Sequence, residues 1–216
     1  YNVHYVGHPL LDAIKKLEIN SIEKDKIIAL LPGSRDQEIS KILPIMIDSA
    51  KYFKEYKFVI CAAPSKNKSY YKKYFNKESH SNIEIAENKT YEILSKSKAA
   101  LVTSGTATLE AALKKTPQIV CYKSSWISYT IGKFLLRNLK FISLVNLILK
   151  KEAVKELIQN ELNTANIVDE LKLILNDKGR NRILKLYEEL ENLLDKQGAS
   201  KDTASRIYKY HLESNS

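Results

Sequence analysis

An alternation of short apolar runs with longer amphipathic stretches is the feature that most constrains the fold of this chain. Each apolar run is flanked by turn or polar residues, as buried strands are, and the runs predict strands at residues 27–31, 58–62, 83–86, 99–103 and 118–122. Helical patterns lie between them, at residues 37–53, 68–75, 90–95 and 106–114. Pro44 should kink the first of these helices or delay its start. Strands that alternate with helices predict an α/β fold with a Rossmann-like parallel sheet and helices on both of its faces.

After residue 122 the pattern indicates helices only, at residues 126–139, 153–159 and 164–176. Residues 176–179 predict a break between two helices. Residues 180–195 predict a helix whose apolar stripe we interpret as a packing face, formed by Ile183, Leu186, Tyr187, Leu190, Leu193 and Leu194. Residues 199–212 predict a last helix. We therefore expect an interdomain linker at residues 1–20, a Rossmann-like domain at residues 21–160, and C-terminal helices at residues 161–216 that pack back on this domain or toward a missing one.

The chain has a formal net charge of +10, from 35 Lys and Arg against 25 Asp and Glu. Such an excess favours an anionic partner, which is a nucleic acid, an acidic membrane surface or a phosphorylated small molecule. A lysine-rich surface that serves solubility explains the same charge. The charge by itself leaves these interpretations open.

The two cysteines, Cys61 and Cys121, lie in apolar runs and predict buried, reduced thiols in a cytosolic protein. Two thiols form neither a disulfide framework nor a zinc site by themselves. No signal peptide or uninterrupted transmembrane span is visible, since the longest apolar stretch, residues 134–149, is broken by Arg137 and Lys140. The chain opens at Tyr1 inside an apparent strand or linker, so we expect a folded segment upstream.

The first motif with chemical content is LLPGSRDQEI, at residues 30–39, where a buried strand turns into a helix. Gly33 allows the backbone to approach a ligand closely, and Ser34 with the first helical amides can donate to phosphate oxygens. Arg35 can bind a diphosphate with two hydrogen bonds. The alternative interpretation is a tight turn in which Ser34 caps the helix and Arg35 is solvated.

The second motif, TSGTATLEAAL at residues 103–113, has the same layout. Ser104, Gly105 and Thr106 place hydroxyl groups and bare backbone at a helix N-terminus, which suits a phosphate. Glu110 lies one helical turn deeper, where a carboxylate can accept the two hydroxyls of a ribose. The alternative is a Ser/Thr cap followed by a glutamate that complements the helix dipole.

The two motifs together predict a nucleotide-diphosphate site. Both turns follow strands of one parallel sheet, so both open at the edge where ligands of such sheets bind. Neither is a Walker loop or a G-x-G-x-x-G turn, so ATP and NAD are not favoured.

Five segments in a fixed order carry a resemblance to a known family: VGHPLLD (6–12), LLPGSRDQEI (30–39), LVTSGTATLEAAL (101–113), PQIVCYK (117–123) and SLVNLI (143–148). They resemble lipid-A-disaccharide synthases over nearly the whole chain. The resemblance implies a GT-B glycosyltransferase, in which two Rossmann-like domains face a cleft and this chain is the C-terminal, donor-binding half. The family transfers a sugar from UDP-2,3-diacylglucosamine to 2,3-diacylglucosamine 1-phosphate, inverts the anomeric centre, releases UDP and needs no metal.

The resemblance also implies roles for residues. Gly33, Ser34 and Arg35 would hold the diphosphate, and Ser104, Gly105 and Thr106 would lie near it. Glu110 would hold the ribose. Asn146 matches the family's asparagine near the donor sugar, although Val145 stands here where the family usually has proline.

We assign no catalytic residue, metal site or cofactor to this chain. The sequence has no D-x-D motif, which agrees with a metal-free reaction. The base that activates the acceptor would come from the missing N-terminal acceptor domain, so this chain alone is expected to be inactive. The family implies a cytoplasmic enzyme of Gram-negative bacteria, peripheral at the inner face of the inner membrane. A homodimer is left open.

Residues 126–149 are a candidate for docking on an anionic membrane, because they combine aromatic groups with Lys133, Arg137 and Lys140. The competing interpretation is that their apolar groups pack on the sheet or against the missing domain.

Two other functions are weighed. One is a UDP-N-acetylglucosamine 2-epimerase, which has a related fold, although the Pro-Gly-Ser-Arg turn and the Asn146 segment match the synthases better. The other is a basic nucleic-acid-binding module. We expect no nucleic-acid partner, because the chain has no RNP-type, zinc or KH-like motif and its lysines are spread along it.

Overall fold

A six-stranded parallel sheet organises the chain. The structure is a computed structural model and describes residues 6–7, 10, 24–78, 80–123, 140–194 and 199–214. The strands are β1 (Asp25–Leu31), β2 (Lys57–Ala62), β3 (Ile83–Glu87), β4 (Ser97–Thr103), β5 (Gln118–Tyr122) and β6 (Lys155–Ile158). Their order is β3-β2-β1-β4-β5-β6, and every neighbouring pair is parallel. This is the doubly wound order in which the chain changes direction beside β1, so the predicted fold class is confirmed.

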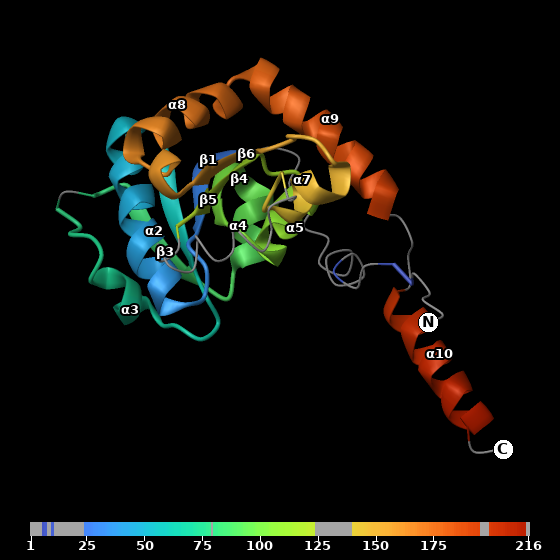
Figure 1. Cartoon of the computed structure of the whole chain (residues 1–216). Coiled ribbons are helices and arrows are strands. Elements are labelled where there is room, and N and C mark those ends of the chain that lie inside the picture. Colours follow the sequence, from blue (N-terminus) through green and yellow to red (C-terminus); the bar gives the residue numbers. More distant parts are fainter. Residues whose placement is uncertain are drawn as a thin grey trace.

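Helices cover both faces of the sheet (Figure 1). Because side chains alternate along a strand, Ile28 and Leu30 of β1 join the larger core with α2 (Asp36–Ser49) and α8 (Thr164–Leu175). Ala29 and Leu31 point to the other face and join a smaller cluster with α4 (Thr90–Lys96) and α5 (Thr106–Leu113). The sheet is therefore buried on both sides, as expected for a parallel sheet.

Helix α2 begins at Asp36, immediately after the β1 turn, so Pro44 does not delay its start. Its buried residues recur every three or four positions, which places one apolar stripe on the sheet: Ile39, Ile42, Leu43, Met46 and Ile47. The predicted helix ran to residue 53, but the last turn is a 3₁₀ helix, η1 (Ala50–Tyr52). The predicted helix at residues 68–75 is shorter in the structure, where α3 covers Lys68–Lys72.

The predicted packing stripe lies on α9 (Asp177–Leu194), where Ile183, Tyr187, Leu190 and Leu194 are buried. Leu193 does not belong to this stripe, since it is 57% exposed. The predicted break at residues 176–179 is narrower than expected, because α8 ends at Leu175 and α9 begins at Asp177. The last helix, α10 (Ala199–Ser214), extends away from the sheet (Figure 1).

Strand β6 corrects two sequence-based predictions, namely a helix at residues 153–159 and the end of the strands at residue 122. Lys155 pairs with Ile119 of β5, and Ile158 pairs with Tyr122. Lys, Glu and Leu favour a helix locally, but the free edge of β5 offers backbone partners that only the assembled sheet provides. Tertiary pairing therefore decided this element, and a short 3₁₀ helix, η2 (Gln159–Glu161), follows it.

The predicted helix at residues 126–139 lies outside the described residues. Downstream of it the structure has a short helix, α7 (Leu144–Leu149), which the sequence did not predict as a separate element. None of the helices in the described ranges is long and apolar enough to span a membrane.

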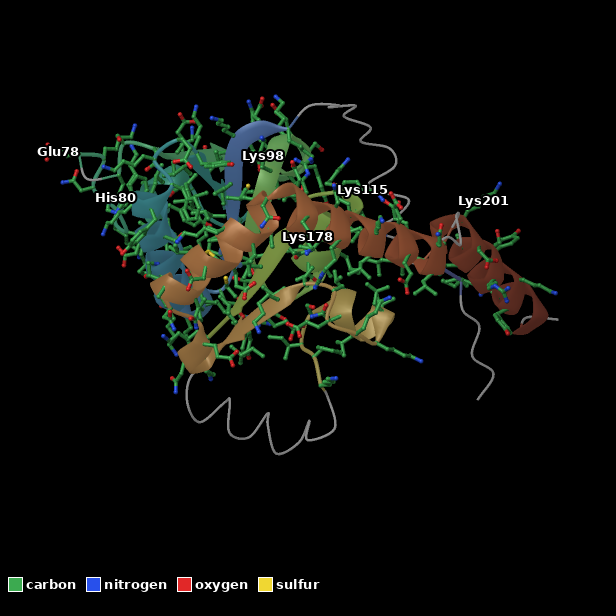
Figure 2. The ribbon with its side chains drawn as sticks, turned by 90° about the horizontal axis from the view of Figure 1, so that it is seen from above. Glu78, His80, Lys98, Lys115, Lys178 and Lys201 are labelled. Carbon is green, nitrogen blue, oxygen red and sulfur yellow. The ribbon has the colours of Figure 1, made fainter. Side chains whose placement is uncertain are left out.

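Lysine side chains lie on several different elements. Lys98 is on β4, Lys115 follows α5, and Lys178 is on α9 (Figure 2). Lys201 lies on the separate helix α10. These four positive charges therefore do not gather on one element.

Candidate active site

A cavity of about 490 Å³ opens at the carboxyl ends of β1, β2 and β4. It lies where the strand order reverses between β1 and β4, which is where ligands of doubly wound sheets bind. The cavity is lined by all seven residues that the sequence assigned to phosphate and ribose: Gly33, Ser34, Arg35, Ser104, Gly105, Thr106 and Glu110. The structure thus brings together two motifs that are far apart in the sequence.

The β1–α2 turn requires glycine at position 33. Its φ is +92°, a backbone conformation that strains any other residue, whereas the 2.8 Å approach of a Cβ to Oε2 of Glu38 could be relieved by moving that flexible side chain. Arg35, and not Ser34, is the N-cap of α2, and its side chain makes no capping hydrogen bond. Within the described residues, the amides of Asp36 and Gln37 have no acceptor. The alternative interpretation of Ser34 as a cap is therefore wrong, and the first amides of α2 remain open to an anion.

Arg35 lies at the mouth of the cavity with its side chain 81% exposed. Its Nη1 donates to Oε1 of Glu38 at 2.9 Å. An exposed ion pair of this kind contributes about 0–1 kcal/mol, so a diphosphate can compete for the guanidinium at little cost. Sequence reasoning missed Glu38, although its place three residues after Arg35 on a helix could have indicated the pair.

The β4–α5 turn offers a second set of amides. Gly105, with φ of +129°, is the N-cap of α5, and no side chain caps the helix. In the part of the chain that the structure describes, the Thr106 and Ala107 amides have no acceptor. A Cβ at Gly105 would meet nothing within 4 Å, so glycine is needed here for its backbone conformation rather than for space. The positive end of the α5 dipole therefore faces the cavity.

Glu110 lines the same cavity. Burial raises the pKa of its carboxyl group, and a hydrogen bond from the Tyr91 side chain opposes that rise. When ionised, this carboxylate has lone pairs for the hydroxyl groups of a ligand. The contact with Tyr91 of α4 was not predicted, because it depends on how α4 and α5 pack.

Asn146 is not brought to the cavity with the other predicted residues. It is fully buried, and its Nδ2 donates to the Val154 carbonyl and to Oε1 of Glu156, each at 2.8 Å. Its Oδ1 accepts from the amides of Ala153 and Val154 at 2.8 and 3.0 Å. All the hydrogen-bonding groups of this side chain are therefore engaged within the fold.

Both cysteines are buried and free, as predicted. Cys61 lines the cavity, and burial raises the pKa of its thiol to about 12. The thiol is therefore protonated at neutral pH and is not a nucleophile.

Within the described ranges, no group of three or more His, Cys, Asp or Glu side chains is placed to hold a metal ion. That the site needs no metal therefore stays a prediction.

Comparisons with known proteins agree with the motifs. The family model described as lipid-A-disaccharide synthetase matches residues 1–208. A lipid-A-disaccharide synthase of Syntrophus aciditrophicus is 36% identical over 209 residues, which cover 91% of this chain and 54% of that protein. The chain thus spans about half the length of the curated relatives it matches.

Solved structures support the fold. The chain resembles a putative UDP-N-acetylglucosamine 2-epimerase from Listeria monocytogenes, with a TM-score of 0.62 and 14% identity over 96% of this chain and 53% of the other. It also resembles the calicheamicin glycosyltransferase CalG4, with a TM-score of 0.56 and 13% identity over 89% of this chain and 43% of the other. These likenesses agree with a Rossmann-like half of a GT-B fold.

Proposed function

Because this chain belongs to the lipid-A-disaccharide synthase family, we propose that it is the donor-binding half of such an enzyme. It binds UDP-2,3-diacylglucosamine, whose sugar is transferred to 2,3-diacylglucosamine 1-phosphate with inversion, to form lipid A disaccharide and UDP. The observation that carries this proposal is the single cavity in which two uncapped helix N-termini, Arg35 and Glu110 meet.

Each part of the cavity has a proposed task. Arg35 and the free amides of α2 and α5 bind the diphosphate and stabilise the negative charge that develops on departing UDP. These donors are fixed by the fold before the ligand arrives, so little reorganisation is needed during the reaction. Glu110, which lines the same cavity, accepts the ribose hydroxyls. No residue of this chain is assigned as the base.

The partner of this half is an N-terminal acceptor-binding domain, which supplies the base. Both substrates are acylated, so we place the enzyme in the cytoplasm, peripheral at the inner face of the inner membrane. The proposed membrane-docking segment lies largely outside the described residues and stays a hypothesis.

Isothermal titration calorimetry of the purified chain tests the proposal. We expect UDP to bind in the presence of EDTA and to bind more tightly than ADP or GDP. A chain that binds UDP only with Mg²⁺ or Mn²⁺ would contradict the metal-free site. Equal affinity for the three nucleotides would contradict the assignment to UDP.

A further inference from the structure

Thr103 is a cavity residue with an unused hydroxyl group. It is the last residue of β4, directly before the second turn, and it lines the cavity. Its Cγ2 lies 3.4 Å from the position that a Cβ would take at Gly33, so the side chain stands between the two turns. Thr103 is only 3% exposed, and its Oγ1 has no hydrogen-bond partner among the described residues.

A buried hydroxyl without a partner is costly to the folded protein. Leaving such a group unsatisfied destabilises a protein, and most buried polar groups in native proteins are paired. Valine has nearly the same shape as threonine and suits a buried strand position better than a polar group without a hydrogen-bond partner. The position of Thr103 at the floor of a ligand cavity therefore points to a partner that arrives with the ligand.

The neighbouring Ser104 differs, because its hydroxyl proton is already used. Ser104 Oγ lies 3.3 Å from the carbonyl oxygen of Ile142, and since a carbonyl only accepts, the hydroxyl must donate. The backbone at Ile142 is itself held, because the amides of Ile142 and Ser143 each donate to the Glu156 carboxylate at 2.9 Å. Toward the cavity Ser104 therefore offers lone pairs, which cannot bind phosphate oxygens.

We propose that Thr103, and not Ser104, supplies the hydroxyl hydrogen bond to a phosphate oxygen of the nucleotide diphosphate, while Ser104 positions the turn by staying bonded to Ile142. A rotation of about 120° about the Cα–Cβ bond of Thr103 brings the hydroxyl group to the position that the methyl group now holds and moves the methyl group to the next staggered position, so the hydroxyl can donate to the ligand. The inference rests on the proposed function and deepens it, since it assigns a phosphate-binding residue within the same cavity.

Three variants test this division of roles, each measured by calorimetry with UDP and with uridine and by thermal unfolding without ligand. Thr103→Val keeps the shape and removes the hydroxyl. It should raise the Tm of the free chain, weaken UDP about tenfold or more and leave uridine unchanged. Thr103→Ser restores a hydroxyl and should bind UDP within about threefold of the wild type. Ser104→Ala should weaken UDP less than Thr103→Val does.

A Thr103→Val variant that is more stable without ligand but binds UDP more weakly indicates a hydroxyl that serves the ligand. Removal of a purely structural hydroxyl would lower both the stability of the free chain and its affinity for UDP. The inference is overturned if Thr103→Val binds UDP as the wild type does, or if Ser104→Ala loses as much affinity as Thr103→Val. If Thr103→Val does not fold, Thr103→Ala takes its place and is judged by the same ratio of UDP to uridine affinity. A wild-type chain that binds no UDP refutes the proposed function and this inference with it.

Discussion

Replacing Glu156 by glutamine is a sensitive test of the packing behind the cavity. Glu156 is 9% exposed, and its carboxylate accepts four hydrogen bonds. Oε2 accepts from the Ile142 amide at 2.9 Å. Oε1 accepts from the Ser143 amide at 2.9 Å, from the Ser143 hydroxyl at 2.7 Å and from Nδ2 of Asn146 at 2.8 Å. Three of these four groups can only donate, so glutamine must direct an N–H against a donor.

The cost follows from that geometry. The best orientation of glutamine keeps its oxygen on the three donors at Ser143 and Asn146, and loses the bond to the Ile142 amide. A lost partner of a buried donor costs about 1–3 kcal/mol, and each remaining bond weakens by about 1 kcal/mol when the acceptor loses its charge. Part of this loss is offset, because neutral glutamine does not incur the desolvation penalty of a buried ion, which is roughly several kcal/mol. We therefore expect Glu156→Gln to destabilise the chain by about 2–4 kcal/mol.

Thermal unfolding and urea titration measure this change. For a chain of this size, about 3 kcal/mol corresponds to a fall in Tm of roughly 6–12 °C. Glu152→Gln is the matched control, because Glu152 lies just before the same strand with its side chain 54% exposed and an ion pair of 3.7 Å to Lys155. This control should change stability by less than about 0.5 kcal/mol. Equal stability of the two variants would refute the reasoning that the Glu156 carboxylate organises residues 142–146.

Three further predictions concern the ligand. Arg35→Ala should weaken UDP about ten- to hundredfold in calorimetry and leave uridine nearly unchanged, because Arg35 is assigned to phosphate; equal losses for the two ligands would contradict that role. Burial raises the pKa of Glu110, so its carboxylate takes up a proton at a pH where an ordinary glutamate is still ionised. Since the ionised form accepts the ribose hydroxyls in stronger hydrogen bonds than the protonated form does, UDP and uridine affinities should fall together as the pH falls through that range. Glu110→Gln should bind both ligands more weakly and lose this pH dependence, and an unchanged pH profile would exclude Glu110. Finally, the purified chain should form no disaccharide from the two acylated substrates in a chromatographic assay, because it spans about half the length of its relatives; turnover by the pure chain would place the base within it.

Strands β1 to β5 and the two glycine turns after β1 and β4 follow from local sequence. The β1 and β4 patterns are short, apolar and followed by glycine within two residues. The carboxyl ends of both strands and the glycine positions agree with the structure, although each strand begins two residues earlier than predicted. Because parallel strands carry their ligands at one edge, the residues from Gly33 to Arg35 and from Ser104 to Thr106 could be assigned to one site without knowing the order of the strands.

The assembled fold decided what depends on distant partners. Residues 155–158 have helix-forming side chains, yet they form a strand because β5 offers a free edge. Asn146 and Glu156 are polar residues, which are usually exposed, yet the packing of α7 against β6 buries them in one hydrogen-bond network. Thr103 and Ser104 are neighbouring hydroxyl residues, and only the approach of Ile142 separates their roles. Local backbone preference and periodicity depend on neighbouring residues. The partner of a polar group or of an open strand edge depends on tertiary contacts.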